Sequence, residues 1–261
     1  MVEGTGFENR HSGNRIEGSN PSLSARDAKM PRTGYSLCHE DWIRTMSLEN
    51  HYNKIYSENE KTFGDGKPEK VVSDITKYKS SGSVLELGAG EGRNSLFLAG
   101  QGFEVTAQDI SQVGIEKLTK AAQEKSLNIQ TEVKDIRTLD SDQNYDIFVC
   151  TYVLHHLSRE DAVLLVKQIQ EHTNADGLNA VTTFTENGDF YKNNPSTANF
   201  YPEEGELRNL YADWEVLEYE EVENQAFAKR PDGSPMVNVS AKIIARKPKS
   251  NEKNAHYSTA R

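Results

Sequence analysis

Three glycines, at positions 88, 90 and 92, are the residues with the clearest chemical meaning. They lie in VLELGAGEGRNSLFLAGQGFEVTAQDIS (residues 84–111), between an apolar run and a helix-like one. Glycines at a sharp strand-to-helix turn permit positive φ and let a ligand touch the backbone. Asp109 follows Gly88 by 21 residues, the distance at which an acidic residue meets ribose hydroxyls. The stretch therefore predicts a nucleotide-like ligand, either a nicotinamide dinucleotide or S-adenosyl-L-methionine.

Three details favour S-adenosyl-L-methionine over the dinucleotide. Glu86 precedes the first glycine, and a carboxylate there suits an ammonium group but repels a pyrophosphate. The dinucleotide pattern places its third glycine three positions after the second, where this chain has Arg93. Asp135 ends the next expected strand, where a carboxylate and its adjacent backbone suit the amino group of adenine.

Each of these residues also has a purely structural interpretation. In this interpretation, the glycines serve only tight packing, and Asp109 caps the following helix together with Ser111. Asp135 would then be a turn residue, and Glu86 a salt-bridge partner at the end of its strand. The sequence leaves these alternatives open. The combination of the glycine turn with two following strand-end aspartates is what favours a ligand site.

The elements around the turn alternate between strands and helices. Apolar periodicity predicts helices over residues 47–61, 67–79, 94–101, 112–125, 159–173 and 203–211. Strands are predicted over residues 83–87, 103–109, 129–135, 145–152, 178–184, 214–222 and 236–246. We expect Ser111 and Ser158 to cap the helices that follow them. The fold class is therefore α/β: a doubly wound, Rossmann-like, seven-stranded and mostly parallel sheet with an antiparallel edge hairpin.

The chain divides by composition into three parts. Residues 1–45 are rich in Gly, Ser, Asn and Arg without a sustained apolar period, so we expect disorder or an extension created by a start codon placed too early, with Met46 as the true start. A genuine flexible tail is the alternative. Residues 46–247 form the predicted domain, and residues 248–261 a flexible tail.

Charge and cysteine content limit the function classes. The formal net charge is −10, and an acidic surface repels phosphate backbones, which disfavours a nucleic-acid substrate. No apolar run is long enough for a membrane span. The two cysteines, Cys38 and Cys150, have no metal-ligand spacing and are consistent with a cytoplasmic location.

The domain resembles the class I S-adenosylmethionine-dependent methyltransferases. Within residues 46–247, LELGAGEGRNSLFLAGQGFEVTAQD, YDIFVCTYVLHHL and EEGELRNLYADWEVLEY are similar to the tellurite-resistance (TehB-like) group. The resemblance implies methyl transfer to a small-molecule acceptor, with S-adenosyl-L-methionine as the cofactor. The cofactor-binding residues that it implies are Glu86, Gly88, Ala89, Gly90, Gly92, Asp109, Ile110, Asp135, Ile136, Cys150 and Tyr152.

Two segments depart from that group. Its members carry a histidine-bearing loop between the last two strands, and the position aligned by length here is Phe227, in QAFAKRPDG. The segment ENGDFYKNNPSTANFYP, after the fifth strand, also differs. Both are parts that would touch substrate. The resemblance therefore supports methyl transfer more firmly than it supports an oxyanion acceptor.

Methyl transfer from a sulfonium requires alignment more than acid–base chemistry, and the sequence assigns no catalytic residue. His155 and His156 are candidates for a general base, although packing is the stronger interpretation. Tyr52 and Tyr56 either close over the cofactor or belong to the core. The remaining aromatic candidates for a substrate roof are Phe190, Tyr191, Phe200 and Tyr201, for which a buried role is the alternative. Alternatives to this enzyme are a methyltransferase that acts on a macromolecule with a partner subunit, a non-catalytic S-adenosylmethionine-binding module and a nicotinamide oxidoreductase.

Overall fold

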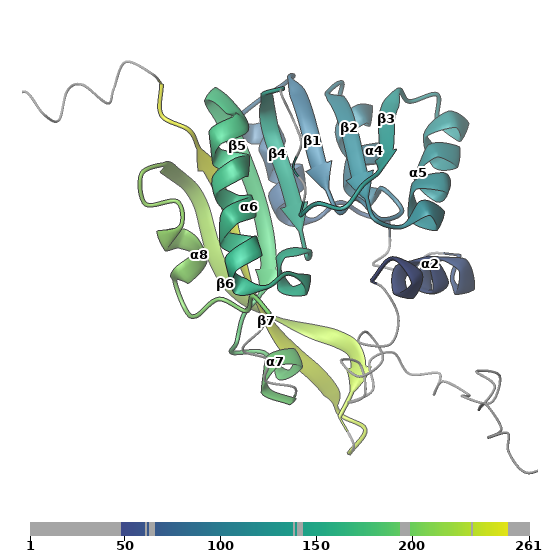
Figure 1. Ribbon diagram of the computed structural model, residues 1–261, viewed down its shortest axis with the longest axis vertical. Coiled ribbons are helices and arrows are strands. Elements are labelled where there is room, and N and C mark those ends of the chain that lie inside the picture. The colour runs from purple at the N-terminus through teal and green to yellow at the C-terminus, as the bar shows by residue number, and fades with distance from the viewer. Residues whose placement is uncertain are drawn as a thin grey trace, which may run out of the picture. The chain divides into compact units, whose positions relative to one another are not determined.

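The structure is a computed structural model (Figure 1), and it describes residues 48–60, 62, 66–137, 139, 143–193, 199–230 and 232–249. The expectations for residues 1–45, and for nearly all of the tail from residue 248, lie outside the described residues. The rest of the predicted domain can be compared with the structure element by element.

One seven-stranded sheet organises the fold, as predicted. Its spatial order is β3 (Ile129–Val133), β2 (Glu104–Asp109), β1 (Ser83–Leu87), β4 (Tyr145–Thr151), β5 (Thr173–Phe184), β7 (Pro235–Arg246) and β6 (Glu215–Lys229). The first five strands pair in parallel, and β7 pairs antiparallel with both β5 and β6. The strand order reverses between β1 and β4, and ligands bind beside such a switch point in doubly wound sheets.

Helices cover both faces of the sheet. The helices of the described chain are α2 (Leu48–Glu58), α3 (Lys70–Ser73), the 3₁₀ helix η1 (Asp74–Lys77), α4 (Arg93–Gly100), α5 (Gln112–Glu124), the 3₁₀ helix η2 (Leu154–His156), α6 (Arg159–His172), α7 (Asp189–Asn193) and α8 (Glu206–Asn209). Helices α6 and α8 contribute to the core on one face, where Leu165 and Leu207 pack together with Phe148. Helices α3 and α4 supply Val72 and Leu98 to the core on the other.

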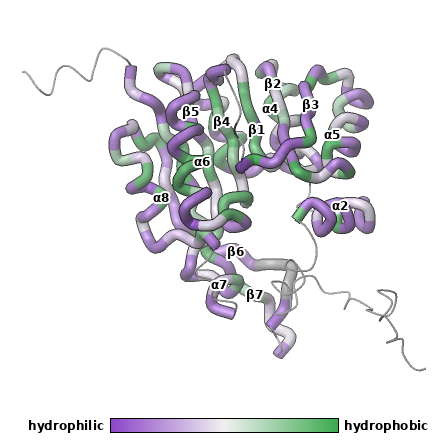
Figure 2. Tube along the Cα trace, viewed as in Figure 1, coloured by the Kyte–Doolittle hydropathy of each residue, from purple (hydrophilic) through white to green (hydrophobic). Residues whose placement is uncertain are grey.

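The central strands are hydrophobic along their length because both of their faces are covered (Figure 2). Parallel strands buried on both faces read as continuous apolar runs, which is why SVLEL and IFVC were recognisable in the sequence. The predicted helix caps are also present. The Ser111 side chain accepts from the backbone N–H of Gly114, and Ser158 accepts from that of Asp161.

Residues 67–79 do not form the single helix that periodicity predicts. A four-residue α-helix is followed directly by a 3₁₀ turn. The Ser73 hydroxyl donates to the Lys70 carbonyl, and the Thr76 hydroxyl donates to the Ser73 carbonyl. Such side-chain bonds compete with the α-helical backbone pattern, so the segment tightens.

The antiparallel hairpin is longer than predicted. Strand β5 ends its pairing with β7 at Phe184 opposite Ser240, whereas β6 and β7 continue to Lys229 opposite Pro235. The hairpin therefore extends past the carboxyl ends of the parallel strands (Figure 1). Residue 227 lies within β6, and its side chain is outside the described residues.

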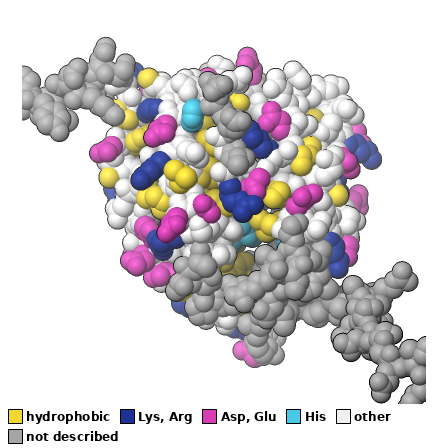
Figure 3. Space-filling view, in the orientation of Figure 1, with side chains coloured by type: hydrophobic (Ala, Val, Ile, Leu, Met, Phe, Trp, Pro, Cys, Tyr) yellow, Lys and Arg dark blue, Asp and Glu magenta, His cyan; other side chains and the backbone are white. Residues whose placement is uncertain are grey.

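The visible surface mixes both signs of charge (Figure 3). Among the described helices, none is both long and apolar enough to cross a membrane. Helix α2 packs on α5, beyond the carboxyl ends of β1, β2 and β3 (Figure 1). This edge of the sheet is where the predicted site residues converge.

Candidate functional site

The glycine turn connects β1 to α4 and adopts the conformation that its sequence predicts. Gly88, Gly90 and Gly92 have φ values of 74°, 55° and 85°, a region that side chains disfavour. A Cβ atom on Gly88 would lie 2.2 Å from Cγ2 of Val153, and one on Gly92 would lie 2.1 Å from Cδ1 of Leu118. The turn therefore needs glycine both for its backbone and for its packing.

Asp109 holds the turn to the start of α5. Its carboxylate accepts from the backbone N–H of Gly90 (2.8 Å) and from that of Ser111 (2.8 Å). Burial raises the pKa of Asp109, and these two hydrogen bonds oppose the rise. The structural interpretation, in which Asp109 helps Ser111 to cap α5, is therefore partly correct, because the Asp109 carboxylate accepts from the backbone N–H of the capping residue Ser111. A carboxylate has about four lone-pair sites, so two donors leave capacity for ligand hydroxyls.

Glu86 lies beneath the turn and is 1% exposed. One of its oxygens accepts from the Asn94 amide (2.8 Å) and the other from the Ser95 hydroxyl. Burial raises the pKa of Glu86 to about 7. These two hydrogen bonds connect Glu86 to the first turn of α4 and fix that helix under the glycine turn. Arg93, which begins α4, forms its ion pair with Glu69 at 2.7 Å.

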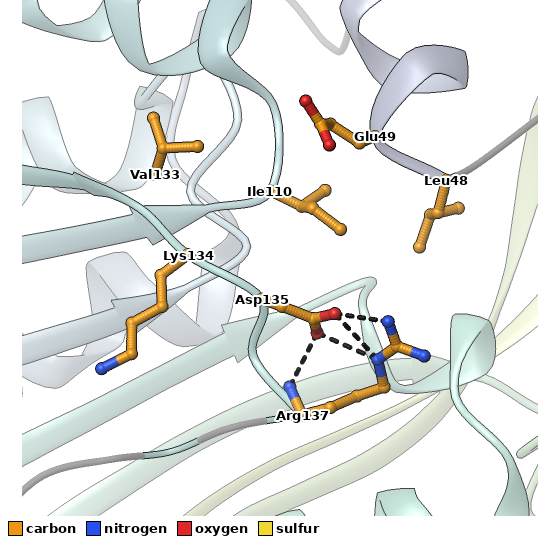
Figure 4. A pocket seen from close by; sticks show the side chains of 7 residues that line it. All are labelled: Leu48, Glu49, Ile110, Val133, Lys134, Asp135 and Arg137. Carbon is orange, nitrogen blue, oxygen red and sulfur yellow. Dashed lines mark hydrogen bonds and ion pairs between the residues drawn. The ribbon is translucent and has the colours of Figure 1, made fainter.

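A cavity of about 360 Å³ opens beside the ends of β2 and β3. Its lining residues are Leu48, Glu49, Ile110, Val133, Lys134, Asp135 and Arg137 (Figure 4). Ile110 projects into the middle of this group, between α2 and the segment after β3. Val133 is 46% exposed here. An exposed aliphatic side chain in a partly apolar cavity suits a flat apolar ligand group.

Asp135 lines this cavity but is engaged by Arg137. Its oxygens accept from the backbone N–H of Arg137 (3.0 Å) and from the guanidinium Nε (2.9 Å). The Arg137 side chain holds the pKa of Asp135 below its usual range. Asp135 therefore acts as a turn residue, as the structural interpretation expects, and it also lines the cavity.

Two of the predicted site residues are buried in the core instead. Ile136 and Cys150 pack in the hydrophobic cluster on the α6 face of the sheet. Burial raises the pKa of the Cys150 thiol to about 12. Both side chains therefore contribute to the core, and their predicted contact with the cofactor stays a prediction. Ala89, also buried, donates its backbone N–H to the Gln108 carbonyl (2.9 Å) and fastens the turn to β2.

Tyr152, directly after β4, has a strained backbone. Its φ of 57° is unusual for a residue with a side chain, and its N–H donates to the Thr182 carbonyl at 2.8 Å. Burial raises the pKa of the Tyr152 hydroxyl to about 12. The preceding Thr151 accepts from the Asn94 amide (3.1 Å). The end of β4 is thereby tied to the helix that begins at the glycine turn.

Helix α2 contributes Tyr56, a candidate in the sequence, and also Asn53, Leu48 and Glu49, which the sequence did not assign to the site. The Asn53 side-chain oxygen accepts from the Ser111 hydroxyl (2.7 Å) and from the backbone N–H of Val113 (3.2 Å). Tyr56 is 4% exposed, and its hydroxyl would be 2.5 Å from a Cβ on Gly90. Leu48 and Glu49 reach the cavity from the same helix. No local pattern identifies these roles, because they depend on where α2 docks.

Aromatic side chains gather at the carboxyl ends of β4 and β5. The Phe184 ring lies 4.8 Å from Tyr152, 4.9 Å from His155 and 5.1 Å from Phe190, between centroids. The His155 ring also contacts the His156 ring, with centroids 4.0 Å apart and the planes tilted by 44°. Other members of this ring array are Tyr191 and Tyr201, which are 5.4 Å apart. Phe200 takes the buried alternative, because its side chain is fully buried in the core.

Comparisons with known proteins agree with this geometry. The model of the family described as tellurite resistance protein TehB matches residues 46–234. A protein named probable S-adenosyl-L-methionine-dependent methyltransferase TehB, from Haemophilus influenzae (strain 10810), is 36% identical over 176 residues. The matched region is 67% of this chain and 61% of that relative, so the chain spans about three fifths of the relative's length.

Solved structures give the same result. The crystal structure of TehB from Haemophilus influenzae superposes with a TM-score of 0.62 and 32% identity, over 76% of this chain and 66% of that one. The N-methyltransferase NodS from Bradyrhizobium japonicum, in complex with S-adenosyl-L-homocysteine, shares the fold at 15% identity (TM-score 0.60; 77% of this chain, 98% of that one). The family model covers well over half of this sequence, and the chain therefore belongs to the TehB tellurite resistance protein family.

Proposed function

We propose that this protein is a methyltransferase that moves a methyl group from S-adenosyl-L-methionine to a small-molecule acceptor. The observation that carries the proposal is the glycine turn bonded to the strand-end carboxylate of Asp109, beside a cavity at the ends of β2 and β3. The Haemophilus influenzae relative supports it, because that protein is named as a probable S-adenosyl-L-methionine-dependent methyltransferase.

The residues present fit the proposed cofactor. Asp109 is fixed by two backbone donors and keeps acceptor capacity for the ribose hydroxyls. Leu48, Ile110 and Val133 give the cavity apolar walls for the adenine ring, and Asp135 stands at its edge. Glu86 places a buried carboxyl under the turn, where its charge favours a ligand ammonium group.

The protein's chemical task is then mainly positional. S-adenosyl-L-methionine supplies a methyl group on a sulfonium that is already a good leaving group. The turn and α2 orient the donor, and the ring array at the ends of β4 and β5 excludes water from the acceptor's approach. Holding two reactants in line at near contact removes much of the entropic barrier.

The acceptor is proposed to be a small molecule, and the location the cytoplasm. The ring array around Phe184 offers walls for a compact ligand. The net charge of −10 opposes a nucleic-acid substrate. Buried Cys150 is a free thiol, which is compatible with a reducing compartment.

Calorimetry and a methyl-transfer assay test the proposal together. The purified chain should bind S-adenosyl-L-homocysteine and give no saturable heat with NAD. With methyl-labelled donor it should label at least one member of a panel of small thiols, amines, phenols and oxyanions. Saturation by NAD alone would refute the cofactor. Binding of the donor with no transfer to any acceptor in the panel would favour a sensor over an enzyme.

A further inference from the structure

The Tyr52 hydroxyl and Nε2 of His156 lie 2.6 Å apart, although the residues are 104 positions apart in the chain. Tyr52 is on α2, and His156 ends the 3₁₀ turn after β4. Their rings meet edge to face, with centroids 5.4 Å apart. Both side chains are half-buried. A short hydrogen bond between a phenol and an imidazole is a route along which a proton can move.

This pair belongs to a closed series of contacts around the glycine turn. Gly88 packs against Val153, three residues before His156, and Gly90 packs against Tyr56. Tyr56 in turn lies next to Tyr52, with ring centroids 5.8 Å apart. The series thus links the glycine turn, through α2, to the 3₁₀ turn that follows β4. It places the Tyr52–His156 pair between the proposed donor site on the turn and the segment after β4.

We propose that Tyr52 and His156 form a proton relay that deprotonates the acceptor, and that the acceptor is a small phenol. This inference rests on the proposed methyltransferase function. Tyr52 receives the proton of the acceptor hydroxyl while its own proton passes to Nε2 of His156.

The ring array explains why the acceptor is a phenol. The His156 ring contacts the His155 ring, His155 contacts Phe184, and Phe184 contacts Tyr152. The relay therefore stands at one end of a continuous run of aromatic rings. A planar aromatic ligand stacks favourably on such surfaces, and a phenol is mostly protonated near neutral pH, so it needs a base before its oxygen can attack.

The step is balanced without a further reactant. The acceptor O–H bond breaks, and its proton goes to the Tyr52 oxygen as the Tyr52 proton goes to His156. The electron pair of the acceptor oxygen forms the new O–CH₃ bond. The electrons of the broken S–CH₃ bond stay on the donor sulfur, which becomes a neutral thioether. His156 later returns its proton to water.

The decisive experiment compares two acceptors in Tyr52→Phe and His156→Gln. Unsubstituted phenol is protonated at the assay pH, whereas pentafluorophenol is already ionised. Both variants should lower kcat with phenol by roughly 100-fold, the usual size of acid–base catalysis, and leave kcat with pentafluorophenol close to that of the wild type. Equal losses on both acceptors would show a merely structural role and overturn the relay.

A spectroscopic measurement needs no turnover. With S-adenosyl-L-homocysteine bound, 4-nitrophenol should show phenolate absorbance in the wild-type complex below the pH at which it ionises in solution. That absorbance should disappear in Tyr52→Phe. Its persistence in the variant would contradict the inference.

Tyr78→Phe is the matched control, since it removes a phenol hydroxyl that donates to Glu218 at 2.8 Å, outside the site. It should leave both rates and the absorbance unchanged. Methylation of tellurite but of neither phenol would overturn this inference and keep the proposed function. Failure to bind S-adenosyl-L-homocysteine, with no transfer to any acceptor, would remove both.

Discussion

Asp109 accepts a hydrogen bond of 2.8 Å from the backbone N–H of Gly90, so the carboxylate that ends β2 is fixed to the turn that follows β1. One bond thereby links the two features that the sequence shows most clearly. It also means that Asp109 has a structural role in addition to any contact with a ligand, and variants of Asp109 need a control that separates the two.

Replacing Asp109 with Asn should weaken cofactor binding. The amide keeps the shape but offers fewer acceptor sites and no charge, so the loss should be about 1–3 kcal/mol. This corresponds to roughly a 5- to 160-fold rise in the dissociation constant for S-adenosyl-L-homocysteine. Calorimetry measures it. Asp146→Asn is the control. Asp146 also accepts from a backbone N–H, that of Ser83 at 2.9 Å, but it lies at the amino ends of the strands, away from the proposed site. An equal loss of affinity in both variants would refute the ribose assignment.

Replacing Gly88 with Ala should destabilise the fold through a clash with Val153. The new Cβ would lie 2.2 Å from Cγ2 of Val153, at a φ of 74°. We expect a loss of roughly 2–4 kcal/mol in the free energy of unfolding, from overpacking added to backbone strain. Denaturant titration measures this loss.

Gly102→Ala is the matched control, because Gly102 has a φ of 91° and nothing within 4 Å of a built Cβ. It should lose only the backbone contribution, about 1 kcal/mol. Adding Val153→Ala to Gly88→Ala should restore part of the stability. A double variant no more stable than Gly88→Ala would show that the clash is not the cause.

The buried carboxyl of Glu86 should make stability depend on pH. Its pKa of about 7 in the folded protein lies above the ordinary glutamate value of 4.5, mainly because of burial. The native state therefore holds this proton more tightly than the unfolded state, and the resulting stability is fully present below about pH 4.5. It is lost as pH rises through about 7.

Glu86→Gln tests this dependence, because the amide cannot ionise. Denaturant titrations of the wild type should show a free energy of unfolding that falls by about 1–3 kcal/mol between acidic and alkaline buffer. The same titrations of Glu86→Gln should show a smaller fall. Parallel curves for the two proteins would contradict the assignment of the effect to Glu86.

The docking of α2 should depend on Asn53. Asn53→Ala removes the acceptor for the Ser111 hydroxyl and the Val113 N–H, and loss of such a cap costs about 1 kcal/mol. Hydrogen exchange should quicken in residues 48–58 and stay unchanged in β1 and β4. The control is Asn59→Ala, whose amide donates to the Ile55 carbonyl within the same segment. Faster exchange of α2 in the control alone would contradict the prediction.

Local patterns in the sequence were enough to predict the strands of the sheet and the conformation of the glycine turn. Buried parallel strands are continuous apolar runs, and helices repeat with a period that differs from that of strands, so element type is written locally. The same applies to the turn, since Gly88, Gly90 and Gly92 mark positive φ wherever they fold. The caps at Ser111 and Ser158 were readable for the same reason: each acts on the helix that follows it directly.

The side chains that contact one another past the carboxyl ends of the strands could be identified from the folded structure alone. Asn53 contacts Ser111 across a separation of 58 positions in the chain, and Tyr52 contacts His156 across a separation of 104 positions. Contacts between such distant positions produce no periodic pattern in the sequence. Burial likewise placed Cys150 and Phe200 in the core, although both lie in segments that sequence reasoning assigned to the site. Local sequence specifies which segments form helices and strands, but the orientation of these elements toward one another results from packing them into one core.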